Sequence, residues 1–85
     1  MTDDAASLRD WHQSHSAWLQ GYLRRHLHVQ AAEAEDIVQD TWLRILRLSL
    51  TDIASPRAFL SRVALNIFRD RRRHEAVSTR HRYLV

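Results

Sequence analysis

Apolar residues recur at spacings of three and four along most of the chain, and this pattern predicts three helical segments. They cover about residues 5–28, 32–48 and 56–76. Residues 49–55 form a short loop, and residues 77–85 either extend the third helix or fray at the start of a linker. The 85 residues include one Gly, one Pro and few strand-favouring residues outside these runs. An all-α fold, a small bundle of three to four helices, is therefore predicted.

The third helix begins at a clear start signal and has two chemically different sides. The Ser55 oxygen can accept a hydrogen bond from a free N–H group of the first turn, and Pro56 has no N–H to leave unpaired. One broad side is apolar and is expected to pack in the core: Phe59, Leu60, Val63, Ala64, Ile67 and Phe68. The other side carries four polar residues, which we call the basic stripe: Arg62, Asn66, Arg69 and Arg73.

The second helix is divided in a similar way. Its predicted core side holds Ala34, Ile37, Val38, Thr41, Ile45 and Leu48. The opposite side, which we call the outer arc, has Trp42 and Leu46 at its border and consists of Asp36, Gln39, Asp40, Leu43 and Arg47. An apolar anchor within a charged rim is typical of a protein-binding face. A solvated face with one stray leucine is the alternative, and the pattern leaves both open.

Charge is distributed unevenly along the chain. Residues 1–56 hold five Arg against eight acidic residues, whereas residues 57–82 hold eight Arg against two. The chain contains no lysine, and guanidinium groups suit bidentate contacts with phosphates and base edges. Five arginines have few acidic residues near them in the sequence: Arg71, Arg72, Arg73, Arg80 and Arg82. A nucleic-acid-binding face is therefore favoured over a solvated basic face, with Asn66 able to contact a base edge.

Metal binding and catalysis find little support in the sequence. No Cys, paired carboxylate or HExxH pattern completes a metal site around the six histidines. His15 is expected to pack against Trp11 and Trp18 instead. There is no nucleophile with a partner base and no glycine-rich phosphate loop, so we expect a non-enzymatic protein without metal or cofactor. An acidic N-terminus and the lack of a run of about 18 apolar residues favour a cytoplasmic location.

Two motifs resemble a known family. The stretches AEAEDIVQDTWLRIL and SPRAFLSRVALNIFRDRRRHE closely resemble region 2 of bacterial sigma factors of the extracytoplasmic function (ECF) group. The PRAFL helix start and the stretch HSAWLQGYLRRHL look most like the ferric-siderophore, or iron-starvation, subgroup. The resemblance covers about residues 7–82, and the two motifs stand at the separation found in the family.

The resemblance implies a transcription initiation domain with two partners. The helix like residues 33–48 binds the clamp helices of the largest subunit of core RNA polymerase in this family, through positions that match Asp36, Gln39, Asp40, Leu43 and Arg47. The helix like residues 56–75 recognises the non-template strand of the promoter −10 element and helps to melt it. By motif match, the DNA-binding residues are Arg62, Asn66, Arg69, Arg73 and Phe59. The loop 49–55 would help to form a pocket for an extruded base.

The subgroup also implies promoters of iron-uptake genes and a membrane-linked anti-sigma regulator, without direct membrane insertion of this chain. Two departures from the family pattern stand out. Housekeeping sigma factors carry two adjacent aromatic residues where this chain has Phe59 and Leu60, so weaker melting is expected. Asp70 lies among the arginines, where it should pair with Arg69 or Arg73 or turn away from the phosphates.

Region 4, which reads the −35 element in the family, is expected to be absent, so the chain resembles an isolated domain of a longer protein. A competing hypothesis is a protein-interaction module that binds an anti-sigma regulator without DNA contact. An autonomous helix-turn-helix protein is disfavoured, because a seven-residue loop precedes the basic helix where that motif needs a tight turn.

Overall fold

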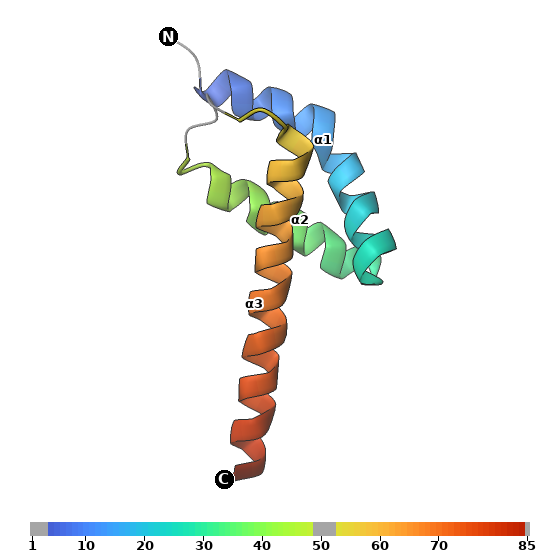
Figure 1. The fold of residues 1–85 in the computed structure, drawn as a ribbon, viewed down its shortest axis with the longest axis vertical. Helices are drawn as coiled ribbons and strands as arrows, with labels where there is room; N and C mark the ends of the chain where they lie inside the picture. Colours follow the sequence, from blue (N-terminus) through green and yellow to red (C-terminus); the bar gives the residue numbers. More distant parts are fainter. Residues whose placement is uncertain (1–3, 49–52, 85) are drawn as a thin grey trace.

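The computed structural model describes residues 4–48 and 53–84, with the side chains of residues 9–48 and 53–78. Three helices make up this part of the chain: α1 (Asp4–Leu27), α2 (Ala31–Ile45) and α3 (Pro56–Leu84). Figure 1 shows α1 and α2 packed together at one end of α3, whose C-terminal half extends away from them. The predicted all-α fold is confirmed. None of the described helices combines the length and apolar character needed to cross a membrane.

The turn between α1 and α2 is tight and contains a strained residue. His28 follows the last residue of α1 and adopts a left-handed backbone conformation, with φ of 56°. Glycine is the usual residue at this position, because a side chain disfavours positive φ. The turn reverses the chain within three residues, and α2 then begins with the Ala34 N–H donating to the Gln30 carbonyl at 2.9 Å.

All three helices contribute to one small core. Its fully or almost fully buried apolar side chains are Leu19, Leu23, Val29, Ala34, Ile37, Val38, Trp42, Ile45, Leu60, Ala64 and Ile67. Thr41 is buried among them, and its hydroxyl donates to the Ile37 carbonyl at 2.7 Å, so the polar group is satisfied within its own helix. The helical spacing thus predicted the core side of α2 correctly as far as Ile45.

The end of α2 differs from the prediction. The helix ends at Ile45, and residues 46–48 form a turn. In that turn the N–H groups of Arg47 and Leu48 donate to carbonyls three residues back, at 3.3 and 3.0 Å. Because this tighter winding turns side chains away from the α-helical register, Leu48 leaves the core side and is 48% exposed. Its predicted core position is wrong.

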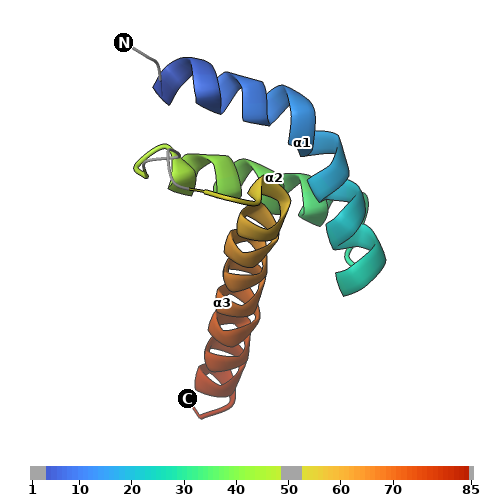
Figure 2. The same cartoon turned by 45° about the horizontal axis from the view of Figure 1, so that its top comes forward.

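The third helix begins where it was predicted and continues past Ala76. The Ala58 N–H donates to the Ser55 hydroxyl oxygen at 3.4 Å, so Ser55 caps the helix ahead of Pro56. The helix then runs to Leu84, so of the two alternatives left open for the residues after Ala76, continuation of the helix is the one observed. No Gly or Pro follows Pro56 in the sequence, so nothing local interrupts the helix. Figure 2 shows the C-terminal half projecting from the other two helices.

The aromatic residues of α1 pack in two groups. Trp11 and His15 meet edge to face, with ring centroids 6.1 Å apart, so the predicted packing of His15 on Trp11 is confirmed. The ring that pairs with Trp18 is Tyr22, at 5.3 Å, and the Arg57 guanidinium lies 4.8 Å from the centroid of the Trp18 ring. These contacts hold the start of α3 against α1.

Candidate interaction surfaces

The outer arc of α2 is accessible along its length. Leu43 is 61% exposed, and Gln39 and Arg47 are also exposed. Arg47 lies in the turn after the helix rather than within it. The two acidic residues of the arc, Asp36 and Asp40, are 70% and 45% exposed at their side chains. The arc therefore offers an exposed apolar side chain beside carboxylates and an amide.

Arg71 of α3 contacts both acidic residues of the arc. Its guanidinium is hydrogen-bonded to the Asp40 carboxylate and lies 3.7 Å from the Asp36 carboxylate. Arg71 has few acidic residues near it in the sequence, and the structure pairs it with acids of another helix. Position 71 lies half a turn from Arg62 and faces α2, whereas the basic stripe faces away from it.

Asp70 and Arg72 of α3 also form ion pairs with residues of α2. Arg72 lies 3.4 Å from the Glu33 carboxylate of α2 and 3.1 Å from that of Glu75 in its own helix. Asp70 pairs with Arg44 of α2 at 3.6 Å, not with Arg69 or Arg73 of its own helix. Together with the Arg71 contacts, these pairs form a polar seam between α2 and the middle of α3.

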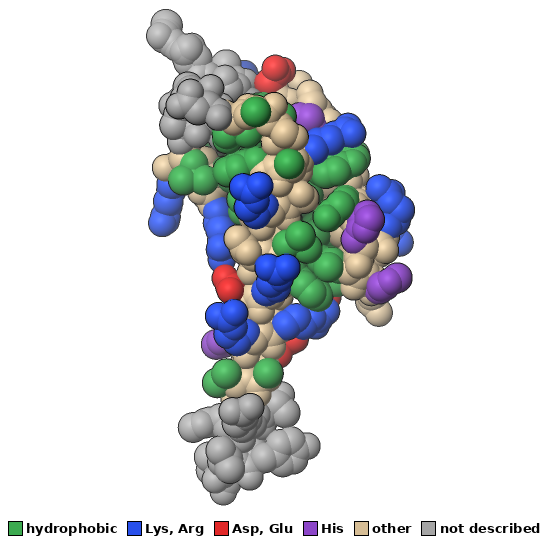
Figure 3. Space-filling view, in the orientation of Figure 1, with side chains coloured by type: hydrophobic (Ala, Val, Ile, Leu, Met, Phe, Trp, Pro, Cys, Tyr) green, Lys and Arg blue, Asp and Glu red, His purple; other side chains and the backbone are tan. Residues whose placement is uncertain are grey.

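The basic stripe remains on the surface. Arg62, Asn66, Arg69 and Arg73 are all exposed. Among the described side chains, no ion pair includes any of the three arginines. Figure 3 shows arginine side chains spaced along α3 on the face turned to the viewer. The stripe is thus a row of cations free to meet an extended anion.

Two neighbouring residues at the start of α3 have different surroundings. Leu60 is fully buried in the core, whereas Phe59 is only partly buried. The Phe59 ring packs edge to face against Trp11, with centroids 6.2 Å apart. Its predicted DNA contact therefore involves a ring that already has an aromatic neighbour. The predicted base pocket in the loop 49–55 falls largely on residues 49–52, which lie outside the described part of the chain.

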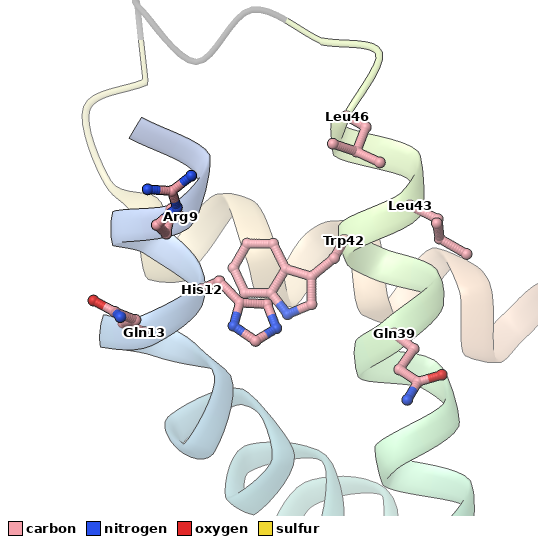
Figure 4. A pocket seen from close by; sticks show the side chains of 7 residues that line it. All are labelled: Arg9, His12, Gln13, Gln39, Trp42, Leu43 and Leu46. Atoms are coloured by element: carbon pink, nitrogen blue, oxygen red, sulfur yellow. The ribbon is translucent and has the colours of Figure 1, made fainter. Parts of the chain in front are cut away.

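A groove lies between α1 and α2 and was not predicted. It has a volume of about 600 Å³ and is lined by Arg9, His12, Gln13, Gln39, Trp42, Leu43 and Leu46. Figure 4 shows Trp42 extending from α2 toward α1, with the His12 ring beside it. Their ring centroids are 5.2 Å apart, and Trp42 is only 7% exposed. Trp42, predicted at the border of the outer arc, is buried there because α1 packs over it, with His12 beside the indole.

Comparison with known proteins identifies the family. Residues 11–77 match sigma-70 region 2. The chain belongs to the sigma-70 region 2 family. It is also similar to the ferric citrate uptake sigma factor FecI of Escherichia coli (strain K12), with 38% identity over 65 residues. That alignment covers 75% of this chain and 37% of FecI. No solved structure gives a significant match.

The family match and the similarity to FecI therefore confirm the resemblance to the iron-related branch of the ECF sigma factors. The matched segment of the region 2 domain contains both the outer arc and the basic stripe. The outer arc lies on α2 and the turn that follows it, and the basic stripe lies on α3; the polar seam joins these two helices through Asp70, Arg71 and Arg72, which are not part of the stripe. Within the described residues, no group of three His, Cys, Asp or Glu side chains is arranged to hold a metal ion.

Proposed function

We propose that this region 2 domain binds core RNA polymerase through the outer arc of α2 and promoter −10 DNA through the basic stripe of α3, in transcription initiation at iron-uptake genes. The observation that carries the proposal is the pair of exposed, chemically different faces on adjacent helices of a sigma-70 region 2 fold. The iron-uptake assignment rests on the similarity to FecI. A membrane-linked anti-sigma regulator is the third partner in this proposal.

The chemistry of the outer arc suits a polymerase helix with apolar and basic side chains. Leu43 can insert between partner side chains, while Asp36 and Asp40 pair with cations at the rim. Arg71 already contacts these carboxylates, but exposed ion pairs of this kind contribute only about 0–1 kcal/mol. A basic partner group can therefore share or replace Arg71 at small cost.

The chemistry of the basic stripe suits promoter DNA. From Arg62 to Arg73 there are eleven residue steps, or about 16 Å of helix, enough to contact several successive phosphates. Asn66 stands between Arg62 and Arg69 and carries an amide that can both donate to and accept from a base edge. In this proposal Phe59 offers its partly exposed ring to an unstacked base of the non-template strand.

The polymerase contact is tested by Leu43→Ala in the purified chain, with binding to core RNA polymerase measured by fluorescence anisotropy. Because Leu43 is exposed, truncating it removes the apolar anchor and leaves no cavity in the core. We therefore expect binding to weaken about tenfold or more while thermal stability stays the same. Val77→Ala, which truncates another exposed apolar residue on α3, is the matched control and should bind normally. Equal binding by the Leu43 variant and the parent protein would reject the outer arc as the polymerase contact.

The DNA contact is tested with two single-stranded oligonucleotides, one carrying a −10 sequence selected by the parent chain and one scrambled. Asn66→Ala should bring the two affinities closer together, whereas Arg73→Ala should weaken both alike and reduce the dependence of binding on salt. Arg24→Ala, an exposed arginine of α1, controls for the loss of one positive charge. Absence of DNA binding even at low salt would favour the protein-interaction module instead.

A further inference from the structure

We propose that the contact with the promoter strand continues from the basic stripe of α3 onto α1, where a row of three aromatic rings stacks with unpaired bases. We call this row the aromatic ladder, and it consists of Trp18, Tyr22 and His26. None of its residues belongs to the contacts proposed above. The identity of the strand as promoter DNA rests on the proposed function, whereas base stacking on the ladder does not.

The ladder is a preformed set of rings on one side of α1. Its members are four residues apart, so they follow one another along the helix axis. The ring centroids of Trp18 and Tyr22 are 5.3 Å apart and those of Tyr22 and His26 are 4.3 Å apart, with interplanar angles of 32° and 38°. Trp18 and Tyr22 are partly exposed and His26 is exposed, so parts of all three rings can meet a ligand.

The ladder has the length and the chemistry to hold a short run of bases. From Trp18 to His26 there are eight residue steps, or about 12 Å of helix, which matches about two or three nucleotides. Bases of any sequence stack on aromatic side chains, because every base has a π-face. The ladder would therefore raise the affinity for a single strand without adding sequence specificity, which the proposed function assigns to Asn66.

Arg57 connects the ladder to α3. Its guanidinium lies 4.8 Å from the centroid of the Trp18 ring, and the residue is exposed. Among the described side chains it forms no ion pair, so it can stack on the ring and still contact a phosphate. Figure 3 shows hydrophobic side chains filling the angle between α3 and α1, beside the arginines that follow α3. A strand held by the basic stripe can cross this surface to reach α1.

The charge of this surface favours a polyanion. Residues 11–32, which include the ladder, contain no Asp or Glu, and neither do residues 56–69. The last turn of α1 is basic. The carboxylate of Glu33, which follows in α2, is paired with Arg72 at 3.4 Å. Along these two stretches the helices therefore offer a phosphate backbone cations and no carboxylate.

The start of α3 offers an unpaired strand little stacking surface by itself. Leu60 is fully buried, and the partly buried Phe59 already packs against Trp11, with ring centroids 6.2 Å apart. The ladder adds three rings on the adjoining helix. A strand held there recovers part of the stacking that its bases lose when they leave the duplex.

Single-stranded oligonucleotides test the ladder in the purified chain, with binding measured by fluorescence anisotropy. The short one carries only the −10 sequence selected by the parent chain, and two long ones extend it by four adenosines at the 5′ or the 3′ end. Two further long ones carry abasic sites in place of the adenosines, which keeps the phosphate charge and removes the bases. We expect one adenosine extension to raise the affinity about tenfold and its abasic counterpart to raise it less than about threefold.

Matched variants place the added affinity on α1. Tyr22→Leu and His26→Ala should each weaken binding of the favoured long oligonucleotide about fivefold and of the short one less than about twofold, with His26→Ala unfolding at the temperature of the parent. His28→Asn changes an exposed histidine of the following turn to a residue that tolerates positive φ, and it should alter neither affinity. Arg57→Ala should weaken binding of the long oligonucleotide about threefold or more, and Arg24→Ala, which removes the same charge from another exposed site, less than about twofold.

Three results would overturn the proposal. The first is no gain in affinity from either extension, or an equal gain from the abasic one, which would mean that only phosphates are bound. The second is an equal loss for the short and long oligonucleotides in His26→Ala. The third is competition by a glutamate-rich peptide that lowers the affinity for the long oligonucleotide to that for the short one, which would make an acidic protein the occupant.

The proposed function fails through different results. If the short oligonucleotide is not bound while the long one is bound through its added bases, the basic stripe is rejected and the ladder stands. If the short one is bound and the extensions add nothing, the ladder is rejected and the stripe stands. If neither is bound even at low salt, both are rejected.

Discussion

The two halves of α3 form one continuous helix but are stabilised differently. Residues 56–68 pack against α1 and α2, and their side chains include Leu60, Ala64 and Ile67, all nearly or fully buried. Among the described side chains of residues 69–78, none is buried, and contacts to α2 are ion pairs made by Asp70, Arg71 and Arg72. Figure 2 shows this second half leaving the other helices.

The comparison of the two halves shows that a segment can be helical although tertiary packing stabilises it only weakly. Burying a leucine side chain contributes about 1.5–3 kcal/mol, whereas an exposed ion pair contributes about 0–1 kcal/mol. The first half therefore belongs to the cooperative core, and the second half depends on backbone hydrogen bonds, helix propensity and a few weak pairs. The basic stripe crosses this boundary, since Arg62 and Asn66 lie on the first half and Arg69 and Arg73 on the second.

The largest effect is expected from Leu60→Ala. Because Leu60 is fully buried at the contact of all three helices, the substitution should lower the free energy of unfolding by about 2–5 kcal/mol. Urea unfolding followed by circular dichroism measures this loss. Leu43→Ala removes the same atoms from an exposed site and should change the free energy by less than about 0.5 kcal/mol. Similar losses in the two variants would contradict the assigned core.

Two Ala→Gly substitutions compare the two halves of α3 directly, and a smaller loss of stability is expected from them. Ala64→Gly, in the buried half, should lower the free energy of unfolding by about 2 kcal/mol, about half from helix propensity and half from the lost methyl group. Ala76→Gly, at an exposed site in the projecting half, should reduce helicity and speed amide exchange around residue 76 while global stability stays nearly constant. Equal loss of global stability would mean that the whole helix unfolds as one unit.

The smallest effect concerns the polar seam. A double-mutant cycle with Asp40→Ala and Arg71→Ala should give a coupling energy of about 0.5–1 kcal/mol, because both side chains remain partly exposed. The coupling should fall as salt is raised, since added ions screen the pair. A cycle that pairs Asp40→Ala with Arg73→Ala should give no coupling. A salt-independent coupling above about 2 kcal/mol would show that the seam is more enclosed than the exposures of Asp40 and Arg71 indicate.

The surfaces of the candidate sites were partly predictable. Helical periodicity placed the basic stripe and most of the outer arc on exposed faces, because the angle between two side chains on one helix follows from their spacing alone. The partners of Asp36, Asp40 and Asp70 were not predictable. They depend on how α2 and α3 cross; for Asp70, proximity in the sequence pointed instead to Arg69 or Arg73 of its own helix.

What the sequence by itself determined is local: three helices, the capped start of α3 at Ser55, and the side of each helix that is apolar. These features depend on neighbours within one or two turns. Only the tertiary structure decided that Arg71 meets Asp40, 31 residues earlier in the chain, and that α1 covers Trp42 to leave a groove beside it. Contacts between helices depend on crossing geometry and packing, which the pattern along a single helix does not contain.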